Sequence, residues 1–569
     1  MNKLFFALAL LFFPAFSLAQ TFAPEDFVYP LEDVSRLYSA NFGELRSDHF
    51  HSGIDIKTEG VTGKKIAAVA DGYISRISLS PYGYGLALYV THPNGTTSVY
   101  GHMQEFSDAV TKYVAQERYR TKSQTANLFC SSKQFPVKQG DIIGLSGNSG
   151  SSGGPHLHFE IRDSATQEPI NVVSHKIITP RDNMAPLIMR VHYIEVDSLQ
   201  GIARKAPLRS YDVVKNGGNY TILGAENIPV GRKGYFVVEA SDRRNDVSNT
   251  FGIYNLTASV DGQKYFEYNM DRISFARTRY CNAVGYYPIM IKSRNEALRL
   301  SAIENGDLSH YSTIVNRGVV SSKTGQVRNV EIMVKDDCGN ASQLNFTIKG
   351  KSDDECYKAE VVDVKSIAYA KKQYEYRGDN ITVTIPANAL YESTIFECEE
   401  SDAADSTIYS KVFDVLNIDT PLHKLMQLSI AADVPFHLQS KVGVACVSRS
   451  GKPSFICGEY RYGSVTVSSR NAGKFYVVAD TEPPTLKLSF AEGAQLSESK
   501  EFTCAMSDEL SGVAKYSATL NGAWIALDLD KGVLTHKFRS EPSGSAHTLI
   551  IEATDAVGNK TEITRNFIR

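Results

Sequence analysis

The sequence predicts a mainly β protein of several domains, and three features lead to that prediction. Many short runs rich in Val, Ile, Tyr and Thr lie between turns of Gly, Asn and Asp, a pattern typical of strands. The chain has 569 residues, which is too long for one hydrophobic core and indicates about three or four domains. Similar Asp-rich turns recur at matching places in its later part, which favours repeated β-sandwich modules.

The N-terminal segment predicts export. Lys3 precedes an apolar stretch at 4–16, and Ser17-Leu18-Ala19 supplies small residues at a cleavage site. We therefore expect residues 1–19 to be a signal peptide and the mature chain to begin at Gln20. A retained anchor is the alternative, although the stretch is shorter than the roughly 18 residues of a membrane span. The expected location is the periplasm or cell envelope, or the medium after secretion, and we expect no membrane span.

The charge of the chain excludes one class of partner. The formal net charge is −3, so no basic surface argues for nucleic acid or an anionic membrane.

The first domain is expected at 20–180, and its strands are clear in the sequence. Asn94-Gly95 lies between two β-rich runs and predicts a tight hairpin. The expected strands lie at 65–70, 73–77, 87–92, 97–100 and 156–161. Between them, the apolar residues of 106–120 have helical spacing, so a short helix is expected inside an insertion at 106–134.

The rest of the chain is expected to form three β modules, at 181–350, 351–479 and 480–569. Asp182-Asn183-Met184-Ala185-Pro186 and Asp480-Thr481-Glu482-Pro483-Pro484 open the outer two. Asp336-Asp337-Cys338-Gly339-Asn340 and Asp555-Ala556-Val557-Gly558-Asn559 follow at matching late positions. These two modules are predicted to be Ig-like β-sandwiches. The middle one is also interpreted as a β-sandwich, but its type is left open. Such acidic turns can bind calcium, although turn chemistry alone accounts for them.

The chain has eight cysteines, an even number that permits disulfides in an exported protein. Cys446 and Cys457 flank a short hairpin-like segment, and we expect them to be bonded to each other. The sequence contains no CxxC motif, so a cysteine-based zinc site is not supported.

Histidines supply the chemistry of the first domain. His156 and His158 are two residues apart in an expected strand, so their side chains lie on one face. His51 and Asp55 form a second cluster, and His102 is a third candidate. A catalytic zinc site needs three protein ligands and an open position for water, which His51, Asp55 and His158 would supply. His102 and His156 would then be free to move protons and stabilise an oxyanion.

These motifs resemble the lysostaphin/LytM-type zinc endopeptidases, which carry a duplicated hybrid motif and cut peptidoglycan peptides. The resemblance rests on segments that match in order and spacing: 42–46, 51–55, 100–103, 144–150 and 156–160. It implies an antiparallel β domain with Zn²⁺ bound by His51, Asp55 and His158, and with His102 and His156 as the catalytic pair. It covers roughly a quarter of the chain. The insertion after His102 is longer than in compact members and is expected to cover or shape the peptide groove.

Three functions remain open at this point. The first is an exported zinc endopeptidase acting on peptidoglycan crosslinks. The second is a non-catalytic relative that binds peptidoglycan or regulates another hydrolase, and the third is an adhesin or scaffold. The presence of all five polar positions favours the first. The sequence leaves open whether the β modules bind wall glycan, another envelope protein or the catalytic groove. It also leaves open whether Arg46 binds a substrate carboxylate or forms a salt bridge.

Overall fold

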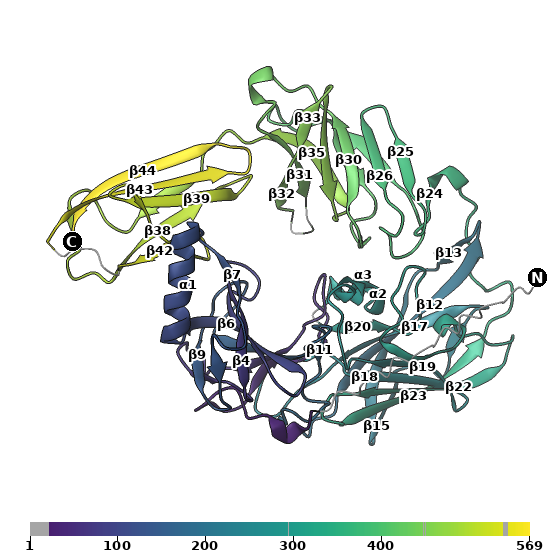
Figure 1. Cartoon of the computed structure of the whole chain (residues 1–569). Helices are drawn as coiled ribbons and strands as arrows, with labels where there is room; N and C mark the ends of the chain where they lie inside the picture. The colour runs from purple at the N-terminus through teal and green to yellow at the C-terminus, as the bar shows by residue number, and fades with distance from the viewer. Residues whose placement is uncertain (1–21, 294, 448, 450, 539–543) are drawn as a thin grey trace, which may run out of the picture.

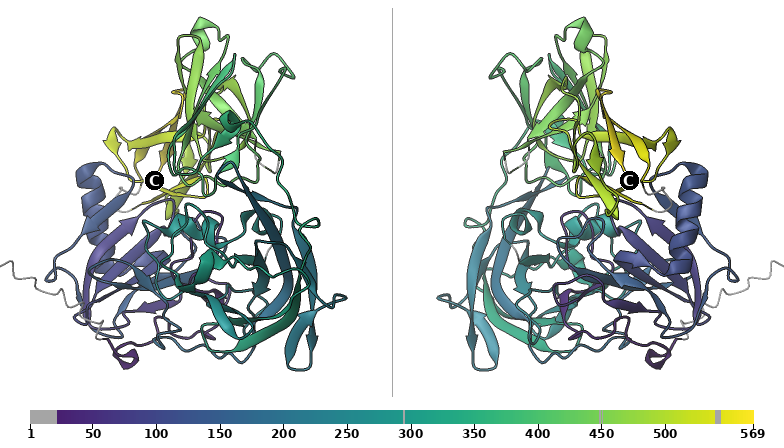
Figure 2. Two further views of the ribbon diagram at one scale, coloured as in Figure 1. Left: turned by 90° about the vertical axis from the view of Figure 1, so that its right-hand side faces the viewer. Right: turned by 90° about the vertical axis from the view of Figure 1, so that its left-hand side faces the viewer.

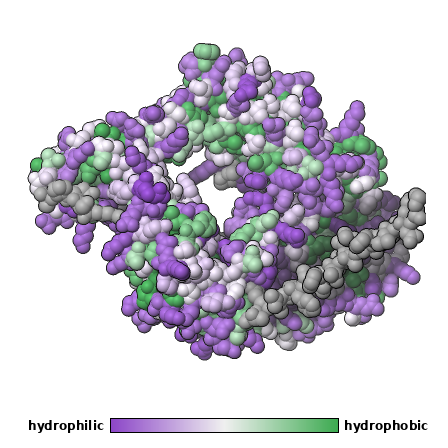
Figure 3. All heavy atoms as spheres, viewed as in Figure 1, coloured by the Kyte–Doolittle hydropathy of each residue, from purple (hydrophilic) through white to green (hydrophobic). Residues whose placement is uncertain are grey.

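A computed structural model describes residues 22–293, 295–447, 449, 451–538 and 544–569. Strands dominate it, which confirms the predicted mainly β fold. The chain is arranged as a ring of four β-rich parts around an opening (Figures 1 and 3). In the side views the first two parts lie next to each other and the third lies above them (Figure 2). The expected signal peptide at 1–19 lies outside the described residues. Among the described helices, none is long and apolar enough to cross a membrane.

The first part is built on an 11-stranded sheet with the order β1-β2-β10-β6-β5-β4-β7 along its main path. Ile54, Leu88, Tyr100 and Phe159 are fully buried in its core. Its elements are β1 Tyr38–Ala40, β2 Ile54–Lys57, β3 Lys65–Ala67, β4 Gly72–Leu79, β5 Leu86–Thr91, β6 Thr96–Phe106, α1 Asp108–Thr121, β7 Ala126–Phe129, β8 Pro136–Val137, β9 Ile142–Ser146, β10 His156–Asp163 and β11 Pro169–Ile170.

The second part is a 12-stranded sheet whose two halves enclose one core. Val238 of β17, Leu256 of β18 and Ile332 of β22 meet in that core. Its elements are β12 Leu187–Leu199, β13 Ile202–Lys205, β14 Arg209–Asn216, β15 Asn219–Ile222, β16 Ile228–Val230, β17 Gly234–Ser241, β18 Asn255–Val260, β19 Gln263–Asn269, α2 Cys281–Val284, α3 Tyr287–Met290, β20 Glu296–Arg299, β21 Tyr311–Ile314, β22 Val327–Lys335 and β23 Ala341–Gly350.

The third part packs two five-stranded sheets around a shared core, as in a β-sandwich. Val383 of β26 and Phe475 of β35 are fully buried there, one from each sheet. Its strands are β24 Ile367–Ala368, β25 Tyr374–Arg377, β26 Ile381–Ile385, β27 Thr394–Ile395, β28 Cys398–Ser401, β29 Val412–Val415, β30 Met426–Ala431, β31 Val442–Val447, β32 Pro453–Cys457, β33 Glu459–Arg461, β34 Ser464–Ser469 and β35 Gly473–Ala479.

The last part is a smaller sandwich of a four-stranded and a five-stranded sheet. Leu534 of β42 and Ile551 of β43 are fully buried between them. Its strands are β36 Thr485–Leu488, β37 Ala494–Gln495, β38 Glu501–Ser507, β39 Val513–Leu520, β40 Ala523–Trp524, β41 Asp528–Asp530, β42 Val533–Lys537, β43 Ala546–Asp555 and β44 Lys560–Ile568.

The last part closes the ring by contacting α1, the helix of the expected insertion (Figure 1). Arg118 is buried and donates to the carboxylate of Asp528 at 2.6 Å. Gln124, just after α1, accepts a hydrogen bond from the backbone of Leu527 at 2.6 Å. The rings of Tyr119 and Trp524 meet edge to face, with centroids 5.3 Å apart. A contact across roughly 400 residues of sequence therefore fixes the last part against the first.

The expected disulfide between Cys446 and Cys457 is wrong, because both thiols are free. The two strands do form a hairpin, as β31 and β32. Its register, however, places Cys446 opposite Ser454 and Cys457 opposite Gly443. The hairpin is therefore closed by backbone pairing rather than by a covalent bond.

Candidate metal centre

Two adjacent strands position the central side chains of the site. β2 pairs antiparallel with β10, and Asp55 lies directly opposite His158. β6 pairs with the other side of β10 and places Gly101, next to His102, opposite His158. His51 lies in the segment just before β2 and reaches the same face. Gly53 allows this approach, because a Cβ there would lie 2.4 Å from the backbone oxygen of Phe159.

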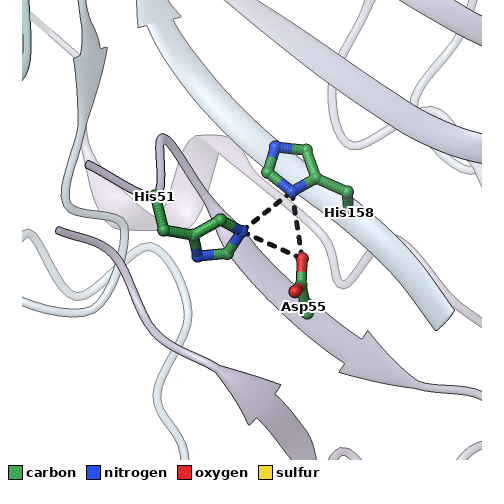
Figure 4. A group of neighbouring side chains, drawn as sticks. All are labelled: His51, Asp55 and His158. Carbon is green, nitrogen blue, oxygen red and sulfur yellow. Dashed lines mark hydrogen bonds and ion pairs between the residues drawn. The ribbon is translucent and has the colours of Figure 1, made fainter. Parts of the chain in front are cut away.

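The three residues that the sequence suggests as zinc ligands point toward one another (Figure 4). His51 Nε2 lies 3.1 Å from Asp55 Oδ1 and 3.1 Å from His158 Nδ1. His158 Nδ1 lies 3.0 Å from Asp55 Oδ1. His51 and His158 are 8% and 3% exposed, so the triangle is shielded from bulk water. Three potential ligand atoms thus converge on one point, as a metal site requires.

The outer nitrogens of both histidines are already engaged. His51 Nδ1 lies 2.8 Å from the carbonyl oxygen of Asn41, and His158 Nε2 lies 2.8 Å from Glu160 Oε1. Carbonyl and carboxylate oxygens only accept hydrogen bonds, so these ring nitrogens donate. The inner nitrogens are then the ones free to offer a lone pair to a metal. Outer partners of this kind typically orient metal-binding histidines, so the residues present fit zinc.

The electrostatics of the triangle also favour a bound cation. Burial raises the pKa of Asp55, but His51 and His158 outweigh it and hold that pKa well below its usual range. Burial lowers the pKa of His158, but its hydrogen bonds to Asp55 and Glu160 outweigh burial and raise it to about 9. The low pKa of Asp55 keeps its carboxylate ionised, which is the form that binds a metal.

His102 and His156 lie beside the triangle. Their rings are 4.8 Å apart between centroids, and His156 Nε2 lies 3.5 Å from Asp55 Oδ1. His102 Nδ1 faces the carbonyl oxygen of Ser149, and His156 Nδ1 faces that of Gly154, each at 2.8 Å. The Nε2 atom of each ring therefore remains available to accept a proton. The structure brings together all five side chains that the sequence singles out.

His102 has two unusual properties. Its backbone φ is 57°, a left-handed conformation that is uncommon for a residue other than glycine and is often found at functional sites. Burial, followed by the nearby His158 and His156, lowers its pKa to about 4. His102 is therefore neutral at physiological pH, the state in which imidazole acts as a base.

An ionic network behind His158 escaped sequence reasoning. Glu160 is fully buried and binds His158 through one oxygen and Arg162 Nε through the other, at 2.5 Å. Tyr84 and Ser52 each donate to the same Glu160 oxygen that His158 uses, at 2.6 Å. The alternation of β10 is the signal that could have revealed it, because residues 156, 158, 160 and 162 share one face.

The second part of the molecule supports the segment that carries His51. Asn41 exchanges two hydrogen bonds with the backbone of Gly252, at 2.9 and 2.8 Å. Phe42 and Phe50 are buried in the core of the second part rather than the first. The carbonyl that orients His51 is therefore held in place by contacts between the two parts.

Arg46 forms a salt bridge at the edge of this segment. Its guanidinium lies 2.5 Å from the Glu44 carboxylate, which agrees with one of the two roles considered for it. Burial raises the pKa of Glu44, although Arg46 opposes that effect.

Comparison with known families matches two regions of the chain. Residues 49–119 and 115–172 match the model of peptidase family M23. Residues 365–480 match the model of a Zu5-like domain, in the region where the sequence left the type of module open.

Individual relatives match the same first region. The DD-carboxypeptidase/endopeptidase Mpg of Neisseria meningitidis serogroup B is 32% identical over 136 residues, 24% of this chain. The match spans 25% of the length of that relative, and the Mpg protein of Neisseria gonorrhoeae matches equally.

Two solved structures match over similar lengths. A variant of the catalytic domain of the prophage-encoded M23 protein EnpA from Enterococcus faecalis is 26% identical, with a TM-score of 0.18, covering 24% of this chain and 85% of that one. The catalytic domain of lysostaphin from Staphylococcus simulans is 23% identical, with a TM-score of 0.17, covering 22% of this chain and 80% of that one. With the family match at 49–172, the domain that holds the five converging side chains is a LytM-type domain of peptidase family M23, followed by β modules.

Proposed function

We propose that this protein is an exported zinc endopeptidase that hydrolyses peptide crosslinks of peptidoglycan. The observation that carries the proposal is the convergence of His51 Nε2, Asp55 Oδ1 and His158 Nδ1 beside two further histidines. The similarity to Mpg, which is named a DD-carboxypeptidase/endopeptidase, supports peptidoglycan peptides as the substrate. Export is supported by the segment at 1–19 and by a substrate that lies outside the cytoplasm.

His51, Asp55 and His158 would hold the zinc ion, with Glu160 and the Asn41 carbonyl fixing the two imidazoles. Zinc in such a site polarises a substrate carbonyl and lowers the pKa of water toward about 7. The chain contributes the fixed geometry, because the β2–β10 pairing sets Asp55 opposite His158.

His102 and His156 would move the protons. In each ring Nδ1 donates to a backbone carbonyl, which leaves Nε2 available, and His156 Nε2 lies 3.5 Å from Asp55 Oδ1. A neutral imidazole at that position accepts a proton from attacking water, and the resulting imidazolium donates to the departing amine. The imidazolium also stabilises negative charge on the carbonyl oxygen during the reaction. Two histidines allow one to take up a proton while the other donates.

The proposal is tested by digesting purified sacculi with the mature protein. Soluble peptide-linked fragments should be released from the sacculi. Their release should stop after treatment with a zinc chelator and resume when zinc is restored. Release that continues at full rate in the chelator would contradict a zinc enzyme. Binding to sacculi without any release would favour the non-catalytic alternative.

The contact between α1 and the last β module is expected to restrain the enzyme. The ligands and catalytic side chains are at most 14% exposed, and we expect a peptide to gain access more easily when this contact is loosened. Arg118→Ala removes hydrogen bonds that a charged group makes to Asp528 and Leu527, each worth about 1.5–3 kcal/mol. We therefore expect Arg118→Ala to cleave a soluble crosslinked fragment faster than the wild-type protein.

The matched control is Arg120→Ala, on the same helix but pairing only with Glu117. It should leave the rate unchanged. Equal rates for Arg118→Ala, Arg120→Ala and the wild type would exclude restraint by the last module and leave that module a targeting role.

A further inference from the structure

A second group of potential metal ligands lies where the chain enters the second part. Asp182, Asp242 and Asp336 each offer a carboxylate oxygen, and these atoms lie within 4.8 Å of one another. They come from the linker before β12, the end of β17 and the turn between β22 and β23. The group is separate from the histidine site.

The carboxylate of Asp242 is the decisive feature of this group. The residue is 0% exposed, and neither of its carboxylate oxygens has a hydrogen-bond partner. The Asp182 side chain is also 0% exposed, and its Oδ2 has no partner either. A buried carboxylate without a partner is costly, and native proteins rarely retain one. These oxygens therefore need a ligand that supplies positive charge.

The nearby arginine does not satisfy them. Arg244 Nη2 binds Asp337 Oδ1 at 2.5 Å. Its Nε lies 3.9 Å from Asp182 and 4.0 Å from Asp242, which is beyond hydrogen-bonding range. Arg244 supplies one positive charge for the four carboxyl groups of Asp182, Asp242, Asp336 and Asp337, so a divalent cation would balance the remaining negative charge when these groups are ionised.

We propose that Asp182, Asp242 and Asp336 bind a calcium ion. Carboxylate oxygens are the ligands of hard cations, and Ca–O bonds of about 2.3–2.6 Å allow ligand separations up to roughly 5 Å. Magnesium usually retains several waters, and the fully buried Asp242 leaves little room for them. A site built only from carboxylates also differs in kind from the nitrogen-containing site that suits zinc.

The internal repeat contains a second group of three Asp residues at corresponding positions. Asp480, Asp508 and Asp555 form a corresponding group in the last part, again from a linker, the end of a strand and an Asp-x-x-Gly-Asn turn. There, however, Asp480 Oδ2 accepts a hydrogen bond from the backbone of Ser511 at 3.0 Å. Of these two groups of described residues, the one around Asp242 holds buried carboxylate oxygens without partners and the one around Asp480 does not, so the proposal is confined to the first.

The ion would act at the joint between the peptidase domain and the first β module. The guanidinium of Arg244 lies over two aromatic rings, 5.6 Å from the centroid of Tyr38 and 4.9 Å from that of Phe251, within the range of cation–π contacts. Tyr38 belongs to β1, next to the strand that carries Asp55. Calcium would thus hold the linker at Asp182 against the segments that carry Asp242 and Asp336. Through Arg244 and Tyr38, it would also stabilise β1 beside the strand that carries Asp55.

The test is a calcium titration of the full-length mature protein, from which calcium is first removed on a chelating resin and to which one equivalent of zinc is then restored. Calorimetry should show that Asp242→Asn binds one calcium ion fewer than the wild type. The control Asp212→Asn, an exposed residue of β14, should bind as the wild type does. Equal calcium binding by Asp242→Asn and the wild type would overturn the proposal.

Thermal unfolding gives an independent readout. Saturating calcium chloride should raise the melting temperature of the wild type by about 5 °C or more, and Asp242→Asn should lose that rise. Without calcium, Asp242→Asn should melt no lower than the wild type, because it removes a buried carboxyl group whose two oxygens have no hydrogen-bond partner. No response of the wild type to calcium, or an equal response to magnesium chloride, would contradict a calcium site.

Discussion

Replacing His158 with Ala is expected to remove zinc from the mature protein and to abolish cleavage of peptidoglycan fragments. His158 supplies one of three converging ligand atoms and is hydrogen-bonded to the fully buried Glu160. Loss of an outer partner alone typically costs about 10- to 100-fold in metal affinity or activity, so loss of the ligand should cost more. His51→Ala and Asp55→Ala should behave in the same way. Metal analysis and fragment digestion on the same preparations measure both effects.

A graded series makes this prediction specific. Glu160→Gln keeps the ligand but weakens its anchor, so it should show the smaller loss of about 10- to 100-fold. His49→Ala is the control, because this exposed histidine lies two residues before His51 and contacts Asp48 instead. Stoichiometric zinc in all three ligand variants would show that the ion is bound elsewhere.

Replacing His102 or His156 with Ala is expected to preserve zinc binding while cleavage falls by about 10²- to 10⁴-fold. Both rings lie beside the triangle, and neither supplies one of its converging ligand atoms. The split between retained metal and lost turnover distinguishes a proton-transfer role from a ligand role. Metal content and turnover measured on each variant provide the comparison.

The low pKa of His102 fits the role of a base. Burial, together with the nearby His158 and His156, lowers its pKa to about 4, so the ring stays neutral, and able to accept a proton, at any pH well above that value. Near-normal turnover by His102→Ala or His156→Ala would remove the residue concerned from the mechanism.

Local sequence patterns predicted much of the site. The two-residue period of a strand places His156 and His158 on one face, and the same rule extends to Glu160 and Arg162. The hairpin at Asn94-Gly95 and the helix at Asp108–Thr121 also follow from local patterns. Each of these features depends on residues that are close together in the chain.

Features that depend on distant residues were not predictable in this way. The docking of Arg118 on Asp528 and the hydrogen bonds between Asn41 and Gly252 join segments that no local period relates. The disulfide expected between Cys446 and Cys457 failed because strand register, rather than spacing, decides which residues face each other.

The most direct test of the central claim is digestion of one defined crosslinked muropeptide dimer by the zinc-loaded mature protein, followed by mass analysis. The account predicts two products whose masses sum to that of the dimer plus one water, with no products from Asp55→Ala under the same conditions. An intact dimer after exposure to protein that carries stoichiometric zinc, or equal cleavage by Asp55→Ala, would contradict it.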